Sequence, residues 1–406
     1  MYEPVHLLMI TTNNNNKFYD QIKINDSEWE ARYGRVGASP QIRRYPLSQW
    51  DKKYREKIAK GYKDMSDMVE EAIEKEKPSG LKEYEEIKNK VIADIVEKLQ
   101  NLAKKTVSDN YKVNASVVTQ KMIDSAQELL DSLVGFNGTV EEFNEKLLEL
   151  FTIIPRKMSN VNEYLIRDKS DFDSKIARES DILNTMRSQV YIKEVTDISE
   201  PSEQPLNKGT ILDALGLEIK EVTNDEIKMI KDLMNESKDK FKRAWKVTNK
   251  KTQKRFDDFV KKEKIKDTRL LFHGSRSENF WSILQTGLVL RPTNAVITGK
   301  MFGYGIYYSP HCQKSIGYTS LSGSYWAKGN NATAYMALFD VAYGIPYDVY
   351  DFNSKYYNLN YNELQKYKQG ANCLHAHKDK GMLRNDEIVI YKEDQMTIKY
   401  LIEIGY

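Results

Sequence analysis

Three short motifs in the C-terminal half of the chain hold residue types that could do chemistry together. The first ends an apolar, strand-like run in His-Gly-Ser-Arg, so His273 lies at a strand end beside a flexible glycine. The second is a glycine-spaced aromatic run at 298–309, and the third is an apolar strand at 387–391 that opens with a carboxylate. Each motif alone also fits an ordinary structural role, so the prediction depends on all three.

Together the motifs favour a site for a flat heteroaromatic ring attached to a sugar. The rings of Tyr307 and Tyr318 could sandwich the heteroaromatic, and the backbone N–H and C=O at Gly274 could bind a carboxamide on it. The carboxylate of Glu387 could stabilise the oxocarbenium-like charge that develops on ribose when its bond to the ring breaks. Nicotinamide leaves from an already cationic ring and needs no acid, so these residues suit cleavage of NAD⁺.

Other cofactor sites are poorly supported. The run at 298–309 matches neither the G-x-G-x-x-G fingerprint nor the P-loop. Cys373, His375 and His377 alternate along a predicted strand and could share one face, which is compatible with a metal ion. Because no fourth ligand is evident nearby, we predict no metal.

The composition is that of a globular protein with little bulk charge, since the net formal charge is only +3 over 406 residues. Two cysteines cannot form a disulfide framework, which fits a reducing compartment. The start has no basic segment followed by an apolar one, and no apolar run approaches about 18 residues. We therefore expect an intracellular protein without membrane contact, in the cytoplasm or nucleoid of a bacterium or the nucleus of a eukaryote.

The first block, through about residue 76, has short apolar segments separated by polar turns, which predict antiparallel strands and then a helix from about Leu47. Between Arg32 and Lys63, ten basic side chains stand against two acidic ones, with tyrosine and tryptophan interleaved. Basic side chains engage phosphates and exposed aromatic faces stack on bases, so the run fits a nucleic-acid surface. A solvated basic face beside an ordinary core fits it equally well.

A breaker, Lys-Pro-Ser-Gly at 77–80, precedes a block at 80–195 with helical periodicity. Its apolar residues form three stripes without paired polar residues that point inward, which predicts a packed all-α bundle with no chemistry of its own. A linker at 196–208 leads to the third block, where 237–245 is predicted to be helical.

The segment Tyr-Gly-Arg-Val-Gly at 33–37 resembles the Trp-Gly-Arg-Val-Gly signature of the WGR domain, with Tyr33 in place of the tryptophan. WGR domains bind DNA ends and nicks. The resemblance therefore implies DNA contacts by Tyr33 and Arg35, and the basic run adds Arg43 and Arg44 as candidates.

Two further resemblances point to one family. The helical block, with Phe-Thr-Ile-Ile-Pro at 151–155, resembles the helical regulatory domain beside the catalytic domain of DNA-dependent poly(ADP-ribose) polymerases. Residues 208–406 are similar to the ADP-ribosyltransferase catalytic domain of that family, because His-Gly-Ser-Arg, Gly-x-Gly-Ile-Tyr and Glu-Ile-Val-Ile-Tyr occur in the family's order. His273, Tyr307 and Glu387 then fall at its His-Tyr-Glu triad.

The resemblance implies roles for individual residues. Glu387 would hold the ribose 2-hydroxyl of NAD⁺ and orient the acceptor, and Lys314 would line the site beside it. Asp386 precedes Glu387, but ungapped alignment of the strand that follows selects Glu387. The residues implied in NAD⁺ binding are His273, Gly274, Ser275, Tyr307, Ser315 and Tyr318.

The prediction is thus a multi-domain α+β protein: a small antiparallel WGR-like DNA-binding domain at 1–76, an all-α helical regulatory domain at 80–195, and an α+β ADP-ribosyltransferase fold with mostly antiparallel sheets at 208–406. We expect an NAD⁺-dependent enzyme that transfers and elongates ADP-ribose on protein acceptors, itself included, and responds to DNA nicks or ends. The alternatives are a mono-ADP-ribosyltransferase acting on protein or DNA ends, an inactive transferase fold that binds DNA, and an NAD⁺ glycohydrolase.

Overall fold

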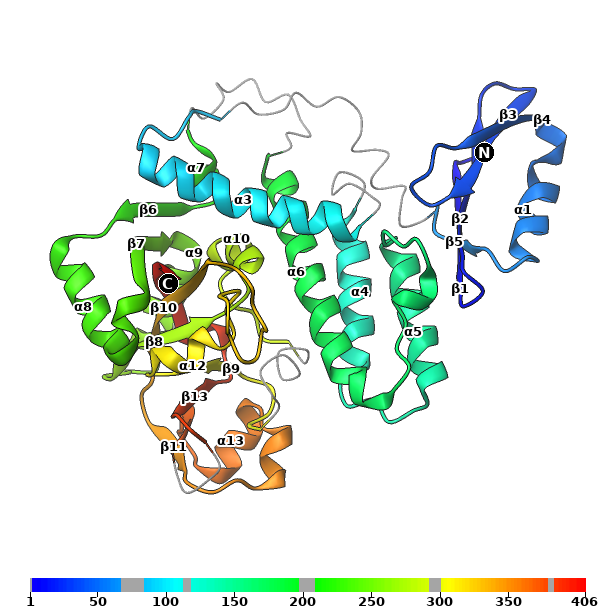
Figure 1. The fold of residues 1–406 in the computed structure, drawn as a ribbon. Helices are drawn as coiled ribbons and strands as arrows, with labels where there is room; N and C mark the ends of the chain where they lie inside the picture. The colour runs from blue at the N-terminus through cyan, green and yellow to red at the C-terminus, as the bar shows by residue number, and fades with distance from the viewer. Residues whose placement is uncertain (1, 67–83, 112–117, 197–208, 292–300, 379–382) are drawn as a thin grey trace. The chain divides into compact units, whose positions relative to one another are not determined.

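A computed structural model describes six segments of the chain: 2–66, 84–111, 118–196, 209–291, 301–378 and 383–406 (Figure 1). The predicted breaker at 77–80, the linker at 196–208 except its first residue, and the first three residues of the aromatic run at 298–309 lie outside them. The chain divides into two compact units, which are Met1–Lys82 with Lys104–Glu203, and Glu83–Ala103 with Gln204–Tyr406.

The first unit begins with a five-stranded antiparallel sheet in the order β4-β3-β2-β1-β5, and helix α1 (Trp50–Ile58) follows β4. The predicted antiparallel strands and the helix after them are therefore present. Trp29, Trp50 and Tyr62 are buried in one apolar cluster with residues of β1 and β2. The strand bounds are β1 Val5–Thr11, β2 Asn15–Lys23, β3 Glu28–Arg35, β4 Gln41–Pro46 and β5 Lys63–Asp64.

Helices make up the rest of the first unit. Helix α4 packs against both α5 and α6, and the predicted apolar stripes at 122–133 and 143–154 are buried there. The third predicted stripe, at 87–102, falls in residues that belong to the second unit, and its Val91 is exposed. Thr119 caps α4, and Thr139 caps α5 in a capping box with Glu142, which satisfies backbone N–H groups that the first turn leaves unpaired. The bounds are α4 Gln120–Ser132, α5 Val140–Ile153 and α6 Phe172–Thr196.

The prediction that no paired polar residues point inward in this bundle was wrong. Arg156 and Glu179 are both buried, and the Arg156 Nη2 lies 3.3 Å from the Glu179 Oε2. Lys175 Nζ lies 2.9 Å from the other carboxylate oxygen, and the Arg156 guanidinium lies 4.7 Å from the centre of the Tyr111 ring. The stripes concealed this cluster because its members come from separate segments whose polar positions are not periodic.

The second unit contains two sheets. A five-stranded antiparallel sheet has the order β6-β7-β14-β10-β8, and a four-stranded sheet has the order β11-β12-β13-β9. Among the strands that the structure describes, β11 and β12 alone pair in parallel. The strand bounds are β6 Leu217–Glu221, β7 Phe241–Asn249, β8 Thr268–Gly274, β9 Ile306–Tyr308, β10 Thr333–Ala342, β11 Pro346–Val349, β12 Cys373–Ala376, β13 Glu387–Ile390 and β14 Met396–Gly405.

Short helices lie around these sheets (Figure 1). The α+β character and the mostly antiparallel pairing agree with the prediction. The predicted helix at 237–245 was wrong from Phe241 on, because a short 3-10 helix ends at Lys240 and β7 occupies Phe241–Asn249. Trp245 and Val247 of β7 are buried and Lys246 between them is exposed, which is the alternation of a strand. The helix bounds are α7 Ile211–Ala214, α8 Asn224–Met234, α9 Lys250–Lys262, α10 Phe280–Thr286, α12 Cys312–Ile316 and α13 Tyr361–Tyr367.

Helix α3 (Lys90–Asn110) begins in the second unit and ends in the first. In the second unit, Lys98 of α3 pairs with the buried Glu403 of β14, with 2.9 Å between Nζ and Oε1. Arg243 of β7 pairs with the other oxygen of Glu403 at 2.8 Å. No helix in the described residues is long and apolar enough to span a membrane.

Candidate active site

The two sheets of the second unit meet where His273 and Tyr307 lie. Phe272 in β8 and Ser309, just after β9, exchange two backbone hydrogen bonds of 2.9 and 3.1 Å, which joins a strand of one sheet to a strand of the other. The Nδ1–H of His273 donates to the backbone carbonyl of Tyr307 at 3.1 Å. The residues of two motifs that are separated by more than thirty positions are thus in direct contact.

The His273 hydrogen bond has a consequence for its ring. A carbonyl oxygen can only accept, so Nδ1 carries the proton and Nε2 keeps its lone pair. Burial lowers the pKa of His273 to about 4, and the bond to the Tyr307 carbonyl opposes this shift only in part. The ring is therefore neutral at physiological pH, with Nε2 as a hydrogen-bond acceptor.

Strand β13 brings Glu387 to the same place. It pairs with β9 so that Val389 lies opposite Tyr307, and Glu387 at its start forms an ion pair with Lys314 of α12. Burial raises the pKa of the Glu387 carboxyl above its usual value, although the charge of Lys314 opposes the shift. Burial is the main cause of the raised pKa of Tyr307 and of Tyr318, and the negative charge of Glu387 adds to both shifts.

Asp386, the neighbouring acid, is directed elsewhere. Its Oδ2 accepts from the Nε2–H of His375 at 3.0 Å, and its Oδ1 accepts from the backbone N–H of Lys378 at 2.7 Å. Of the two adjacent carboxylates, only Glu387 is paired with Lys314 in the described structure.

Two glycines allow close backbone approaches at this site. A Cβ on Gly274 would clash with the backbone carbonyl of Ser315, so only glycine permits β8 to lie directly against α12. A Cβ on Gly305 would clash with the side chain of Val389, so the glycine spacing before Tyr307 serves the packing of that segment on β13.

The remaining predicted binding residues lie on or next to the elements just described. Ser315 is buried on α12, next to Lys314, and the hydroxyl of Ser275 accepts from the Asn279 Nδ2 at 3.0 Å. The Tyr307 hydroxyl donates to the Gly303 carbonyl at 3.0 Å.

Sequence reasoning missed Trp326. Its indole stacks on the Tyr318 ring, with centroids 6.0 Å apart and planes 16° from parallel, although the Trp326 side chain is 61% exposed. The adjacent pair Tyr325-Trp326 was the available signal, since two large aromatics side by side in a polar segment are unusual.

The candidate DNA-binding residues all lie in the first unit. Arg35 is held by hydrogen bonds to the carbonyl of Ser159 at 2.7 Å and to the side chain of Asn14 at 3.0 Å. Arg43 and Arg44 are exposed on β4, and the Arg43 guanidinium lies 5.1 Å from the centre of the Tyr45 ring. Arg44 also pairs with Glu30, with 3.8 Å between Nε and Oε2, but both Arg43 and Arg44 remain exposed, whereas Arg35 is only partly exposed.

The interleaved aromatics of the basic run have mainly structural roles. Trp50 and Tyr62 are buried, and Tyr45 stacks on Trp29 with a centroid distance of 5.0 Å. The Lys57 ammonium lies 4.1 Å from the centre of the Tyr19 ring. Of the two interpretations left open for this run, stacking on bases is therefore not supported for Trp50 and Tyr62, which are buried.

Comparison with known proteins identifies the class of this fold. Residues 218–406 match the family model for the poly(ADP-ribose) polymerase catalytic domain, so the second unit holds an ADP-ribosyltransferase domain, whose substrate is NAD⁺. A protein of Invertebrate iridescent virus 6, named as a putative poly(ADP-ribose) polymerase-like protein 100L, is 36% identical over 193 residues, which is 46% of this chain and 97% of that protein. The chain belongs to the poly(ADP-ribose) polymerase family.

Two further relatives show how the similarity is distributed. An uncharacterized protein of the same virus, 101L, is 34% identical over 186 residues, covering 45% of this chain and 76% of that protein. The poly(ADP-ribose) polymerase of Sarcophaga peregrina is 30% identical over 251 residues, covering 58% of this chain but only 24% of that much longer protein.

Proposed function

We propose that this ADP-ribosyltransferase transfers ADP-ribose from NAD⁺ to protein acceptors, itself included, and elongates the attached chain in response to DNA nicks or ends. The observation that carries the transfer chemistry is the Glu387 carboxylate, which is buried, paired with Lys314 and located on the strand that pairs with Tyr307 and its neighbours. A carboxylate shielded from water acts strongly on charge that develops beside it.

In this proposal the nicotinamide ring stacks on Tyr318, with Tyr307 on its other side. The backbone of Gly274 and the hydroxyl of Ser315 bind the carboxamide. The Nε2 of His273 is an acceptor for a ribose hydroxyl, because Nδ1 donates to the Tyr307 carbonyl and the ring stays neutral.

The bond that breaks joins the ribose carbon to the nicotinamide nitrogen. Its electron pair goes to that nitrogen, so nicotinamide leaves neutral and the ribose acquires oxocarbenium-like positive charge. Glu387 stabilises this charge through the ribose 2-hydroxyl. An acceptor oxygen then bonds to the ribose carbon and gives its proton to Glu387, whose raised pKa suits it to take a proton. A protein acceptor gives initiation, and a hydroxyl of ADP-ribose already attached gives elongation.

The test is to incubate the purified chain with labelled NAD⁺, with and without nicked DNA, and to separate the products on a gel. A ladder or smear of modified protein is expected. One discrete shift would indicate a mono-ADP-ribosyltransferase, and free ADP-ribose alone would indicate a glycohydrolase. Glu387→Gln should suppress elongation far more than NAD⁺ binding measured by calorimetry; equal loss of both would contradict the role proposed for Glu387.

The response to DNA is supported by the exposed basic residues of β4 and by the WGR-like segment at 33–37. The double change Arg43→Ala with Arg44→Ala should weaken binding of nicked DNA and lower the salt dependence by about one unit of slope for each lost phosphate contact. Lys262→Ala, at an exposed position in α9 of the second unit, is the matched control. Unchanged affinity in the double variant would exclude this surface.

For regulation, we propose that the folded helical block hinders access of NAD⁺ and that DNA contact favours its opening, a shift between existing states. The order of the domains motivates this. Glu179→Ala, which leaves Arg156 without its buried carboxylate, should then raise activity in the absence of DNA, while Glu145→Ala at an exposed position of α5 should not. If Glu179→Ala destabilises the helical block and the activity without DNA is unchanged, the proposal that this block hinders NAD⁺ access is contradicted.

A further inference from the structure

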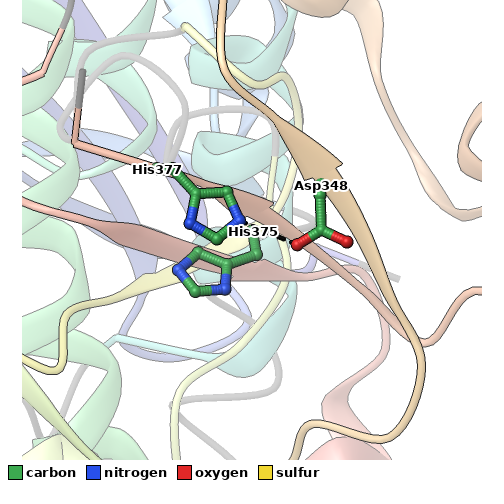
Figure 2. Close-up of side chains that lie close together, drawn as sticks. All are labelled: Asp348, His375 and His377. Carbon is green, nitrogen blue, oxygen red and sulfur yellow. Dashed lines mark hydrogen bonds and ion pairs between the residues drawn. The ribbon is translucent and has the colours of Figure 1, made fainter.

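Two histidines and a carboxylate gather on one face of the four-stranded sheet, apart from the residues assigned to NAD⁺. In the parallel pairing of β11 with β12, Asp348 lies directly opposite His375. His377 follows β12 two positions after His375, so its side chain is on the same face. Figure 2 shows the His377 ring over the His375 ring, with Asp348 facing them from β11.

The spacing of these groups suits one small cation. One ligand atom from each residue lies within 4.8 Å of the others. The two imidazoles are stacked with centroids 3.8 Å apart, and the His377 Nε2 lies 2.7 Å from the Asp348 Oδ1. Ligands placed tetrahedrally at about 2.0–2.2 Å from Zn²⁺ are about 3.3–3.6 Å from one another. The lone pair of an imidazole nitrogen lies in the plane of its ring, so the two stacked rings, whose planes are 22° apart, have to turn out of the stack before both can bind one ion.

A second carboxylate orients the His375 ring from the other side. The Nε2–H of His375 donates to the Asp386 Oδ2 at 3.0 Å, whereas the Nδ1 of His377 lies 4.0 Å from the same oxygen, beyond hydrogen-bond distance. A cation would therefore bind Nδ1 of His375 and Nε2 of His377, which now contact the Tyr343 hydroxyl and the Asp348 carboxylate. Histidines that bind metals commonly hold a carboxylate with the other ring nitrogen in this way, because it sets the tautomer and raises the basicity of the ligand.

The charges around the cluster also suit a cation. In the described residues, neither Asp348 nor Asp386 forms an ion pair with a lysine or arginine.

Neighbouring groups do not supply a competing site. The Cys373 thiol donates to the Tyr343 carbonyl, with 3.3 Å between the sulfur and the oxygen, so it already has a partner outside the cluster. The Tyr343 hydroxyl lies 2.7 Å from the His375 Nδ1, where a cation would displace it or bind it as a fourth ligand. The Arg269 guanidinium lies 3.4 Å from the centre of the Tyr343 ring, but its charge is paired with Asp267.

We propose that Asp348, His375 and His377 bind one Zn²⁺ ion, with Asp386 orienting the His375 ring from outside the coordination shell. Two imidazole nitrogens and one carboxylate oxygen form a ligand set of the kind that zinc accepts. The ion would link β11 to β12. Through His375 it would also be connected to Asp386, the residue before Glu387. It would therefore have a structural role on the sheet that carries Glu387.

The first test is calorimetric titration of the chelator-treated full chain with ZnCl₂. One equivalent should bind, and His377→Gln and Asp348→Asn should each weaken the affinity by at least about tenfold. His311→Gln, at an exposed histidine outside the cluster, is the matched control and should bind like the unchanged protein. The changes are placed at Asp348 and His377 because they are less buried than His375.

A second measurement needs no variant to begin with. Co²⁺ added to the metal-free chain should give the visible absorption of a four-coordinate nitrogen and oxygen site, and Zn²⁺ should abolish it. The thermal midpoint should rise with Zn²⁺ concentration in the unchanged chain and in His311→Gln but not in His377→Gln. Absence of saturable Zn²⁺ uptake, or equal uptake by His377→Gln and the unchanged chain, would overturn the proposal and leave a hydrogen-bonded cluster without an ion.

Discussion

Two buried glutamates, one in each unit, show how the same kind of ion pair can serve different ends. Glu179 in the helical bundle has two cations, Arg156 at 3.3 Å and Lys175 at 2.9 Å. Burial alone would raise the pKa of Glu179, but the two cations outweigh it and the pKa is lowered. The Glu179 charge is thus fully compensated inside the bundle.

Glu387 has one cation, Lys314, and the balance is reversed. Burial raises the pKa of Glu387 because a single ammonium does not offset the loss of water around the carboxylate. A carboxylate in this state remains able to interact with new charge or to take a proton. The comparison teaches that the number of partners, and not burial itself, separates a structural glutamate from one suited to chemistry.

The largest expected effect is on stability at Glu179. Glu179→Ala leaves Arg156 and Lys175 without their carboxylate and should lower the free energy of unfolding by about 3–5 kcal/mol. Urea denaturation followed by circular dichroism measures this. Glu145→Ala, at an exposed position of α5, should change it by less than about 0.5 kcal/mol. Equal effects at the two sites would break the comparison.

Glu387→Gln should show the reverse pattern. The amide keeps the shape of the side chain but loses its charge, so turnover of NAD⁺ should fall by about 10²–10³-fold. The loss in unfolding free energy should be smaller than for Glu179→Ala, because the Glu387 charge is poorly compensated. Turnover and urea denaturation are measured on the same protein, with the exposed Asp351→Asn as control. A larger loss of stability than of activity would refute the role given to Glu387.

Removing one cation should make Glu179 resemble Glu387. Lys175→Met leaves Arg156 as the only partner, so the pKa of Glu179 should rise and the unfolding free energy should fall by about 1–3 kcal/mol. A carboxyl titration by NMR reports the pKa. Lys146→Met, which breaks the surface pair with Glu149, should cost less than about 1 kcal/mol. An unshifted pKa of Glu179 would show that Lys175 is not part of the balance.

The smallest expected effect is a difference in pH dependence. The folded pKa of Glu387 is raised above 4.5, so its contribution to stability is complete below that pH and is lost as pH rises through the folded pKa. The folded pKa of Glu179 is lowered, so its contribution is complete above 4.5 and is lost as pH falls. The unfolding free energy of the unchanged chain minus that of Glu387→Gln should fall from about pH 4 to 7, and the difference from Glu179→Gln should rise. Slopes of the same sign would contradict both assignments.

Local patterns predicted much of this molecule because they act over short distances. The strand that ends in His273 and the strand that opens with Glu387 are apolar runs bounded by polar residues, and both exist as β8 and β13. The prediction for 237–245 failed because its mixture of lysine, arginine and aromatic residues has no clear period. Trp245 is buried because β7 pairs within the sheet, and this depends on the tertiary structure.

Pairings between distant segments could not be predicted. Arg156 and Glu179 are polar residues beside apolar stripes, and the sequence around either residue does not indicate that the two form an ion pair. Asp348 joins His375 only through the parallel register of β11 and β12, so the carboxylate beside the two histidines comes from another strand and could not be read from their local sequence. Whether a side chain has a partner depends on topology, which periodicity does not report.

The course of α3 has a practical consequence for anyone who trims this protein. Asn89 at the start of that helix bonds Glu221 at 2.9 Å, and Lys98 supplies half of the countercharge of Glu403. A fragment that begins at residue 218, where the family match begins, would keep Arg243 but lose Lys98. The buried carboxylate of Glu403 would then have one cationic partner in place of two. The shortest piece that preserves this electrostatic balance has to include residues 89–103.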